Sequence, residues 1–566
     1  MKTYRLRGPI PDDVLTEFSP LVRTLLYNRG ITDANEAKDF LNPDYEKHIH
    51  DASLLKDIDI AVKRIKKAVD ENEKIGIFSD YDTDGIPGAV ILHDFFRAIK
   101  YTNFINYIPH RNKEGFGLNT EAIDTLSNEG VTLLITLDCG ITNVEEVAHA
   151  HKKGMEVIVT DHHLAGEKVP EAVAIVNPKQ ETCTYPEDML CGSGVVFKLV
   201  QALLDAYRDE WNISVGWEKW LLDMVGIATL SDMVPLRGEN RVFARYGLMV
   251  LRKSRRPGLQ KLLRKVRVYQ KTLTEEDVGF MIGPRINAAS RMGIPMDAFR
   301  MLATRDENEA DRLVTHLNSI NDKRKGMVAS MTRSAHKKVY ERHGHEPQLI
   351  AIGDPDWQPS LLGLLANKLM EEYRCPVFTW GRGEGSTIKG SCRAPEGVNV
   401  VELMRGVPEG VFIEAGGHAQ AGGFSVTFDA VHTFGEELLK VYGDKQKDAE
   451  IQIGFDATLS LDDIHDHTIM EINMLAPYGM DNEKPLFKFE GVVPENVRGF
   501  GKTGEHLEIA FRNSKGAPLR AIGFFMNTAS FAKEPVPGKP IDLLAHVEES
   551  NFNGNREVRM RIVDVI

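Results

Sequence analysis

The chain has 566 residues and a formal net charge of −13, with 42% hydrophobic and 27% charged residues. At roughly 100–200 residues per domain, this length predicts about three or four domains, each able to bury a core. The ordinary apolar content excludes disorder as the main state, and no apolar run approaches the roughly 20 residues of a membrane span. Five cysteines without a C-x-x-C pair argue against a disulfide framework or a cysteine-built zinc site. We therefore expect a soluble, cytoplasmic protein with reduced thiols.

Helix and strand patterns alternate after an N-terminal helical segment, expected over residues 1–50. The short runs KIGIFSD, FINYIP, VTLLITLD, MEVIVTD and VAIVNP are typical of buried strands, with helical stretches between most of them. Strands separated by helices predict a parallel sheet with right-handed crossovers. We expect an α/β domain over residues 51–235, with ligands bound beyond the carboxyl ends of its strands.

A mostly helical region and linker follow, expected over residues 236–338. Between Arg237 and Lys271 the chain carries twelve basic residues and one acidic residue, Glu239, so this basic window has a charge of +11. A window of this kind is either a solvated helix face or a patch that follows a phosphate backbone, and the sequence leaves both open.

Two further domains are expected. Residues 339–450 carry a second α/β pattern, with QLIAIGD, a helix near 361–372 and the strands PVFTW and STIKGSCR. Residues 451–566 carry five short strands broken by turns, FKFEGVV, HLEIAFRN, PLRAIGFF, IDLLAHVEE and REVRMRIVDV. Five such strands suit a small closed β-barrel of the OB type, which commonly binds nucleic acid. The predicted fold class is thus multidomain α/β with a C-terminal OB-like barrel.

Acidic and histidine side chains follow three of the predicted parallel strands. They are Asp80, Asp82 and Asp84 after the first, Asp138 after the second, and Asp161, His162 and His163 after the third, with Asp232 in a later helical segment. The carboxyl ends of parallel strands open onto one crevice, so these side chains can converge. Carboxylates held this close repel each other unless cations compensate them. Oxygen ligands with one or two imidazoles suit Mn²⁺ or Mg²⁺.

Each of these motifs also has a simpler interpretation. The DxDxDG string opens like an EF-hand calcium loop, but the twelfth position of that loop must be Glu and here it is Ile91. His162 and His163 alone could be a buried structural pair, and Asp232 alone could cap a helix. The metal hypothesis depends on all four motifs occurring in order on a strand–helix–strand frame.

The motifs SDYDTDG, ITLDCG, VTDHH, IATLSDMVPL, GPRINAASRMG, KGSCR, GGHAQAGG and LAPYGMDNEKPLF occur in this order. Together they resemble the DHH phosphoesterase superfamily over almost the whole chain. The resemblance implies a site for two Mn²⁺ or Mg²⁺ ions. By matching positions, Asp82 would hold one ion, Asp84, His162 and Asp232 the other, and Asp138 both, with Asp80 close by.

The resemblance also implies roles around the substrate. His163 would contact the scissile phosphate and Asp161 would orient the histidines. Gly416, Gly417 and His418 would approach a phosphate from the second α/β domain, although alone they could form a tight glycine turn. Arg111, Arg291, Ser391 and Arg393 would form a pocket for a 5′-terminal phosphate, because the arginine fork bonds phosphate oxygens bidentately.

The function implied by the resemblance is a 5′→3′ exonuclease that degrades single-stranded DNA to mononucleotides in recombination and repair. It would act as a monomer, with a single-stranded-DNA-binding protein and a helicase as further partners. One rival is a phosphoesterase for short oligonucleotides or cyclic dinucleotides, and another is a non-catalytic binding module. Gln358 and Ser290 depart from the family pattern, where His and Gly are common.

Overall fold

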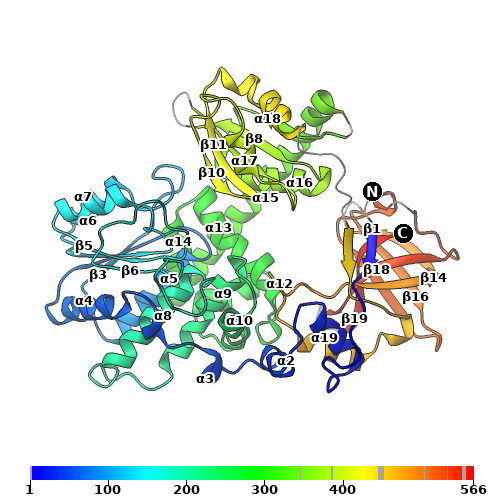
Figure 1. Cartoon of the computed structure of the whole chain (residues 1–566), viewed down its shortest axis with the longest axis horizontal. Coiled ribbons are helices and arrows are strands. Elements are labelled where there is room, and N and C mark those ends of the chain that lie inside the picture. The colour runs from blue at the N-terminus through cyan, green and yellow to red at the C-terminus, as the bar shows by residue number, and fades with distance from the viewer. Residues whose placement is uncertain are drawn as a thin grey trace.

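The computed structural model describes residues 3–566 except 345, 384–386, 444–451, 502–503, 532 and 551–555. Figure 1 shows a parallel-sheet domain with a helical extension, a second α/β domain, and a β-rich domain beside them. The predicted fold class is confirmed by these sheets. The expected boundary between residues 450 and 451 lies outside the described residues. Over the described residues, every helix is too short or too polar to cross a bilayer.

The N-terminal segment packs against the C-terminal end of the chain. Its strand β1 (Thr3–Leu6) pairs in parallel with β12 (Gln452–Phe455). Apolar side chains of its helices, including Leu26 and Phe40, share one buried cluster with the barrel interior. The helices of this segment are α1 (Pro20–Tyr27), α2 (Ala34–Leu41) and α3 (Tyr45–His48).

The first α/β domain contains a five-stranded parallel sheet in the order β3-β2-β4-β5-β6. Its strands are β2 (Ile75–Ser79), β3 (Phe104–Tyr107), β4 (Leu133–Leu137), β5 (Glu156–Thr160) and β6 (Ala174–Val176). Its helices are α4 (Ile58–Asp70), α5 (Gly85–Ala98), α6 (Thr120–Asn128), α7 (Val144–Lys152), α8 (Gly192–Tyr207) and α9 (Leu222–Ser231).

Both faces of this sheet are buried, which explains the continuous apolar runs of its strands. Leu133 and Ile135 on β4 face the cluster built by α4, α5 and α8. Leu134, the residue between them, faces the separate cluster built by α6 and α7. Because the sheet is sandwiched in this way, only the strand ends are open to a ligand.

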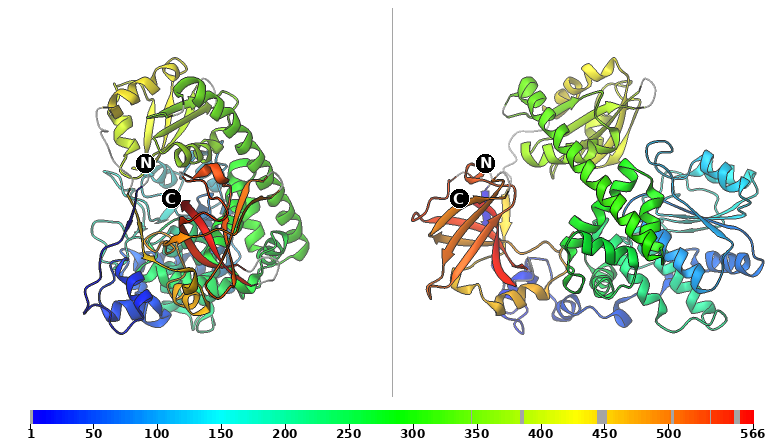
Figure 2. Two further views of the ribbon diagram at one scale, coloured as in Figure 1. Left: turned by 90° about the vertical axis from the view of Figure 1, so that its right-hand side faces the viewer. Right: turned by 180° about the vertical axis from the view of Figure 1, so that it is seen from behind.

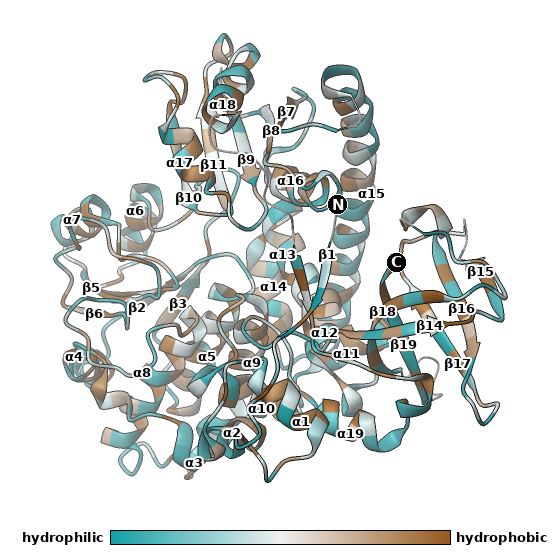
Figure 3. Ribbon diagram, turned by 45° about the vertical axis from the view of Figure 1, so that its right-hand side comes forward, coloured by the Kyte–Doolittle hydropathy of each residue, from teal (hydrophilic) through white to brown (hydrophobic). Residues whose placement is uncertain are grey.

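The helical region leads into a long connecting helix. It comprises α10 (Gly238–Leu251), α11 (Pro257–Lys265), α12 (Glu275–Asp277), a π-helical turn (Val278–Ile282), α13 (Gly283–Met292), α14 (Pro295–Ala303) and α15 (Glu307–His343). The 37-residue α15 runs along the molecule to the second α/β domain (Figure 2). Many residues along α15 are coloured as hydrophilic in Figure 3.

The second α/β domain has a mixed sheet in the order β10-β11-β9-β8-β7. Only β7 and β8 are parallel, and the other neighbours are antiparallel. Its elements are β7 (Ile350–Gly353), α16 (Pro359–Tyr373), β8 (Val377–Arg382), β9 (Ile388–Arg393), α17 (Val400–Arg405), β10 (Glu414–His418), β11 (Ala421–Val426) and α18 (Phe434–Gly443).

The C-terminal domain is a curled sheet in the order β13-β14-β18-β19-β17-β16-β15. Its strands are β13 (Ala457–Thr458), β14 (Phe487–Val492), β15 (Asn496–Phe500), β16 (His506–Arg512), β17 (Pro518–Gly523), β18 (Ile541–Ser550) and β19 (Glu557–Val565). The helix α19 (Asp466–Met474) lies beneath it. The structure adds β13 and β15 to the five predicted strands.

Candidate metal centre and phosphate pocket

The acidic loop after β2 is held by its own backbone. Asp82 Oδ1 accepts hydrogen bonds from the amides of Asp84 (2.8 Å) and Gly85 (3.1 Å). Asp84 accepts from the amides of Gly192 and Ser193 at the start of α8, both at 2.6 Å. The positive end of α8 therefore fixes one carboxylate of the cluster. Sequence reasoning missed Gly192 and Ser193, and the small residues of CGSG at a helix start were the available signal.

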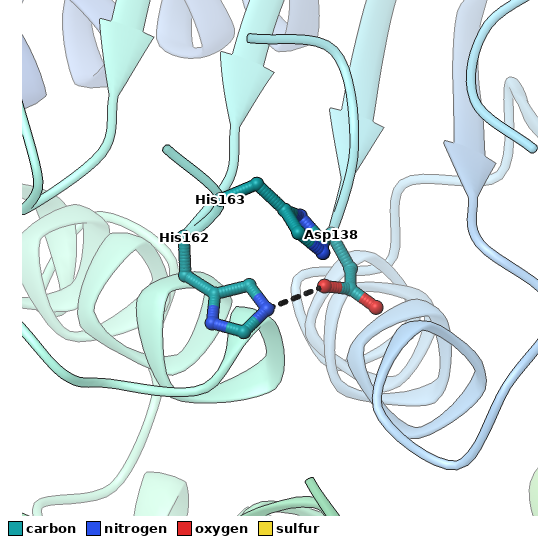
Figure 4. A group of neighbouring side chains, drawn as sticks. All are labelled: Asp138, His162 and His163. Carbon is teal, nitrogen blue, oxygen red and sulfur yellow. Dashed lines mark ion pairs between the residues drawn. The ribbon is translucent and has the colours of Figure 1, made fainter. Parts of the chain in front are cut away.

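Side chains from four separate segments meet at the carboxyl edge of the sheet. His162 Nε2 lies 3.1 Å from Asp138 Oδ1, 3.7 Å from Asp84 Oδ2 and 3.8 Å from Asp232 Oδ2. Figure 4 shows the first of these contacts, with His163 beside it. Asp138 follows β4 in a left-handed conformation with φ 60°, which turns the chain sharply at the strand end. The predicted convergence is therefore present.

The protonation of His162 is set by its second nitrogen. Nδ1 lies 3.0 Å from the carbonyl oxygen of Leu190. Because a carbonyl only accepts, Nδ1 carries the hydrogen and Nε2 is left with a lone pair. Burial, together with the neighbouring His163, lowers the pKa of His162 to about 3, so the ring is neutral. A nitrogen lone pair thus faces a carboxyl oxygen at 3.1 Å, an arrangement that requires a proton or a cation between the two atoms.

His163 is held by Asp161 rather than by the acidic cluster. Its Nδ1 lies 2.8 Å from Asp161 Oδ1, and the same oxygen accepts from both histidine amides. Burial opposes protonation of His163, but the Asp161 carboxylate outweighs it and raises the pKa of the imidazole. Burial likewise opposes ionisation of Asp161, but hydrogen bonds and the charge of His163 lower its pKa. His163 is therefore the more readily protonated member of the histidine pair.

The remaining carboxylates resist ionisation together. Burial and the charge of Asp82 raise the pKa of Asp84 to about 6 and that of Asp80 well above its usual range. Burial and the charge of Asp84 raise the pKa of Asp232 to about 9 and that of Asp138 well above its usual range. Carboxylates behave in this way when burial and like charges act together. Divalent cations would restore their ionised form.

The donor set fits such cations. The described residues contain three groups of side chains that could hold a metal ion. Within each group, the ligand atoms lie within 4.8 Å of one another. The groups are Asp80, Asp82 and Asp138; Asp84, His162 and Asp232; and Asp138, His162 and His163. Asp138 belongs to two of them. In the part of the chain that the structure describes, the buried oxygens Oδ1 of Asp80 and of Asp138 accept no hydrogen bond. Buried oxygens without donors beside a neutral imidazole match the preferences of Mn²⁺ and Mg²⁺.

Arginines gather beside this cluster. The Arg111 guanidinium lies 5.0 Å from the centre of the Tyr81 ring. Tyr81 directly follows Asp80 in the chain. Arg291 Nη1 donates to the carbonyl of Ser360 (2.7 Å), which ties α13 to α16. Burial and the charges of nearby Arg111, Arg324 and Arg393 lower the pKa of Arg291 to about 9. A group of arginines that repel each other is typical of a site for an anion.

Ser391 and Arg393 lie on β9 in this group. Arg393 Nη1 lies 3.3 Å from Ser391 Oγ. A β-carbon added to Gly363 on α16 would stand 3.1 Å from Arg393 Nη2 and 3.2 Å from Ser391 Oγ. All four residues predicted to bind a terminal phosphate are therefore brought into one neighbourhood, shared by two domains.

Gly416, Gly417 and His418 lie on the exposed strand β10, which β11 separates from β9. Through β11, Gly416 is in register with Ser391 and His418 is in register with Arg393. Gly417 has φ 139°, and a β-carbon there would stand 2.4 Å from the carbonyl oxygen of Ala421. The glycines thus allow the tight pairing of β10 with β11. Figures 1 and 3 show β10 on the side of its domain nearer the parallel sheet. The Oε1 of Gln358 at the start of α16 is buried, without a partner among the described residues, and Ser290 is buried in α13.

The basic window does not form one surface. Arg241 is buried, and Arg256 binds Asp223 (2.8 Å) and Asp94 (2.7 Å). The hypotheses of a solvated face and of a phosphate-binding patch are therefore both wrong for these arginines, because their donors are used inside the protein. Six basic residues of the window remain exposed, namely Lys253, Arg255, Arg264, Lys265, Arg267 and Lys271.

Comparisons with known proteins agree with this architecture. Residues 74–229 match the DHH family N-terminal domain, residues 346–443 the DHHA1 domain and residues 455–564 the RecJ OB domain. The fold and its acidic site thus define a DHH-type phosphoesterase.

Close relatives are single-stranded-DNA-specific exonucleases named RecJ. The one from Bacillus subtilis is 34% identical, covering 99% of this chain and 70% of the relative. The one from Escherichia coli is 29% identical, covering 98% of this chain and 97% of the relative. The crystal structure of Thermus thermophilus RecJ in complex with Mn²⁺ superposes with a TM-score of 0.82 at 27% identity, covering 100% of this chain and 79% of that chain. The chain belongs to the RecJ family.

Proposed function

We propose that this chain is a metal-dependent exonuclease that degrades single-stranded DNA from the 5′ end to mononucleotides. The observation that carries the proposal is the neutral His162 facing the Asp138 carboxylate at 3.1 Å within a group of buried acids. The relatives that share the whole architecture are named as single-stranded-DNA-specific exonucleases. Solved RecJ structures are named as complexes with Mn²⁺ or Mg²⁺.

The residues that would hold two cations follow from the ligand groups. Asp80, Asp82 and Asp138 would hold one ion, and Asp84, His162 and Asp232 the other, with Asp138 close to both. When bound, the ions would act as Lewis acids on the phosphate and favour ionisation of a water molecule. Asp161 would keep His163 protonated, and the imidazolium would donate to a phosphate oxygen as charge develops there.

The polarity would come from the arginine group. Arg111, Arg291 and Arg393 lie near the loop that starts at Asp80 and would bind a terminal 5′-phosphate through charge-assisted hydrogen bonds. Binding there would bring the next phosphodiester bond, one nucleotide from the end, toward the cluster. Mononucleotides would then be released. The glycines and His418 of β10 would hold the strand from the opposite domain.

The C-terminal barrel would bind the following part of the strand. Barrels of this type track the backbone with positive charges and stack bases on aromatic rings. Phe524 is 37% exposed, and the guanidinium groups of Arg559 and Arg561 lie 5.5 Å and 5.7 Å from its ring centre. We also propose a cytoplasmic monomer that acts in recombination and repair with a single-stranded-DNA-binding protein and a helicase, as the sequence resemblance implied.

A length series of 5′-labelled single strands and duplexes, with Mn²⁺ or Mg²⁺, tests this function. We expect digestion of long single strands to mononucleotides, little action on blunt duplex, and a preference for a 5′-phosphate. Activity confined to oligonucleotides of a few residues or to cyclic dinucleotides would support the rival phosphoesterase instead. Release of the 3′ label first would contradict the proposed polarity.

A further inference from the structure

Three arginines, spaced four residues apart along α10, donate hydrogen bonds to carbonyls outside their own domain. Arg237, at the N-terminal boundary of the helix, donates to the carbonyl of Arg29 at 2.6 Å. Arg241 donates to the carbonyls of Phe40, Leu475 and Ala476. Arg245 donates to the carbonyl of Leu41. We call Arg237, Arg241 and Arg245 the arginine row.

Arg241 is the central member of the row. Its side chain is fully buried, and its Nη2 donates to Leu475 at 3.0 Å and to Ala476 at 3.2 Å. The guanidinium carbon lies 3.7 Å from the centre of the Phe40 ring. Among the described residues, no carboxylate forms an ion pair with it. A buried cation without an acid must be compensated by dipoles.

Helix C-termini supply those dipoles. Phe40 and Leu41 are the last residues of α2, and Leu475 directly follows α19. Arg29, the acceptor for Arg237, follows the C-cap residue of α1. The carbonyls at such ends are free of helical partners and carry partial negative charge, which cations stabilise. Each arginine of the row thus binds the end of a helix that packs with the barrel.

The loop between α19 and β14, whose carbonyls accept hydrogen bonds from Arg241, is held in place by Asn482. Asn482 Nδ2 donates to the carbonyls of Leu475 (2.7 Å) and Pro477 (2.8 Å), and its Oδ1 accepts from Arg29 Nε at 2.7 Å. This loop carries the LAPYGMDNEKPLF motif, to which the proposed catalytic function gives no role. The motif therefore orients the carbonyls that accept hydrogen bonds from Arg241.

We propose that the arginine row is a positioning device that holds the N-terminal helices and the barrel at a fixed place beside the catalytic domain, and so determines how well long single strands are degraded. This inference rests on the proposed function. Figures 1 and 3 both draw α2, α10 and α19 side by side at this junction.

Two ion pairs across the same junction are weaker anchors. Glu276 binds Arg561 at 2.7 Å and Lys484 at 3.2 Å, with partly exposed side chains. Exposed ion pairs of this kind contribute little to stability. Removing one partner of a buried charged network is much more disruptive, because donors and acceptors are left unsatisfied.

Fixed placement matters because the barrel and the proposed metal centre would bind one strand together. Two linked sites reinforce each other only when their geometry lets them engage the strand simultaneously. A barrel that moves freely lowers the effective concentration of its site next to the metal centre. A strand too short to reach the barrel gains nothing from that placement.

The test compares Arg241→Leu with Arg255→Leu, an exposed arginine of the same window that lies over Trp220. Steady-state rates are measured on 5′-phosphorylated strands of about four and about forty nucleotides, since one OB fold covers about 4–16 nucleotides. For Arg241→Leu we expect kcat/KM on the long strand to fall about tenfold or more through KM, with the short strand within about twofold. Arg255→Leu should match wild type on both strands.

Two further measurements keep the outcome decisive. Small-angle scattering should give a larger radius of gyration for Arg241→Leu, because the barrel separates from the core. If this variant does not fold, the same comparison is made with Arg245→Leu, which removes a single carbonyl contact. Equal effects on both strand lengths, or unchanged scattering in a folded Arg241→Leu protein, would overturn the proposal. A wild-type protein inactive on long strands would instead contradict the proposed function, while scattering would still test the row.

Discussion

Gly192 lies so close to Asp138 that any side chain at position 192 would displace one of the two. A β-carbon on Gly192 would stand 2.6 Å from Asp138 Oδ1, and the Gly192 amide also donates to Asp84 at 2.6 Å. The N-terminal end of α8 therefore contacts two carboxylates of the proposed metal centre, those of Asp84 and Asp138. This contact explains why a glycine opens the helix here.

Gly192→Ala should therefore disturb the metal centre more than the fold. The added methyl must displace Asp138 or α8, and changes to groups that orient metal ligands typically reduce affinity or activity about 10–100-fold. Nuclease rate and Mn²⁺ titration measure this loss. Gly194→Ala is the matched control, because a β-carbon there meets its nearest neighbour, Cys191 Sγ, at 3.5 Å. Equal activity of the two variants would contradict the inference that Gly192 is needed to position Asp138.

The raised carboxyl pKa values predict how the metal-free protein responds to pH. Asp232 has a folded pKa of about 9, whereas an unfolded aspartate titrates near about 3.9. The folded state thus holds a proton that the unfolded state releases, so stability falls as pH rises from about 4 through about 9. Calorimetry in EDTA should show a lower Tm at pH 9 than at pH 6, with a smaller drop in Asp232→Asn.

Added Mg²⁺ should reverse that loss. At about 100 times its Kd, a ligand that binds only the folded state contributes about 2.7 kcal/mol. Because protons compete with the cation for the carboxylates, the gain in Tm should be larger at pH 9 than at pH 6. An equal gain at both pH values, or none, would contradict a carboxylate metal centre.

Asp161→Asn should shift the pH profile through His163. Without the Asp161 charge, the pKa of His163 falls, and the imidazolium is lost at lower pH. We expect the rate to drop about 10–100-fold near pH 8 and less near pH 6. Asp124→Asn removes the partner of His149, an Asp–His pair at 2.8 Å on α6 and α7, and should leave the profile unchanged. A uniform loss at all pH values would exclude this role for Asp161.

Arg393→Ala should weaken selection for the 5′-phosphate. A hydrogen bond to a charged group contributes about 1.5–3 kcal/mol, so the rate ratio between 5′-phosphorylated and 5′-hydroxyl strands should fall about tenfold or more. The exposed Arg405 on α17 offers the control Arg405→Ala. If the ratio is preserved in Arg393→Ala, the phosphate pocket lies elsewhere.

The parallel sheet and the convergence of its acids could be predicted because both depend on local patterns. Each strand is an apolar run that ends in an acid, and parallel topology alone brings Asp84, Asp138 and His162 to one edge. Their individual roles were implied by family resemblance rather than by spacing. The tautomer of His162 could not be predicted, since it depends on the Leu190 carbonyl 28 residues away.

The basic window shows where sequence patterns fail. A run of charge is a surface signal only when its partners are water or another molecule. Arg241 instead binds carbonyls 201 and 234 residues away in the chain, at Phe40 and Leu475. Backbone carbonyls leave no mark in the sequence, so their role as partners of buried arginines could not be seen there. The pairing of β1 with β12 was hidden for the same reason.

The most direct test of the proposed metal centre is the rate of nucleotide release from 5′-phosphorylated single-stranded DNA by Asp138→Asn with saturating Mn²⁺. Asparagine keeps the shape of Asp138 but removes the charge that two ligand groups share. Loss of several kcal/mol of charge stabilisation should slow release by about 10³-fold or more, with folding and DNA binding retained. A folded Asp138→Asn protein with Mn²⁺-dependent activity close to that of wild type would contradict the account.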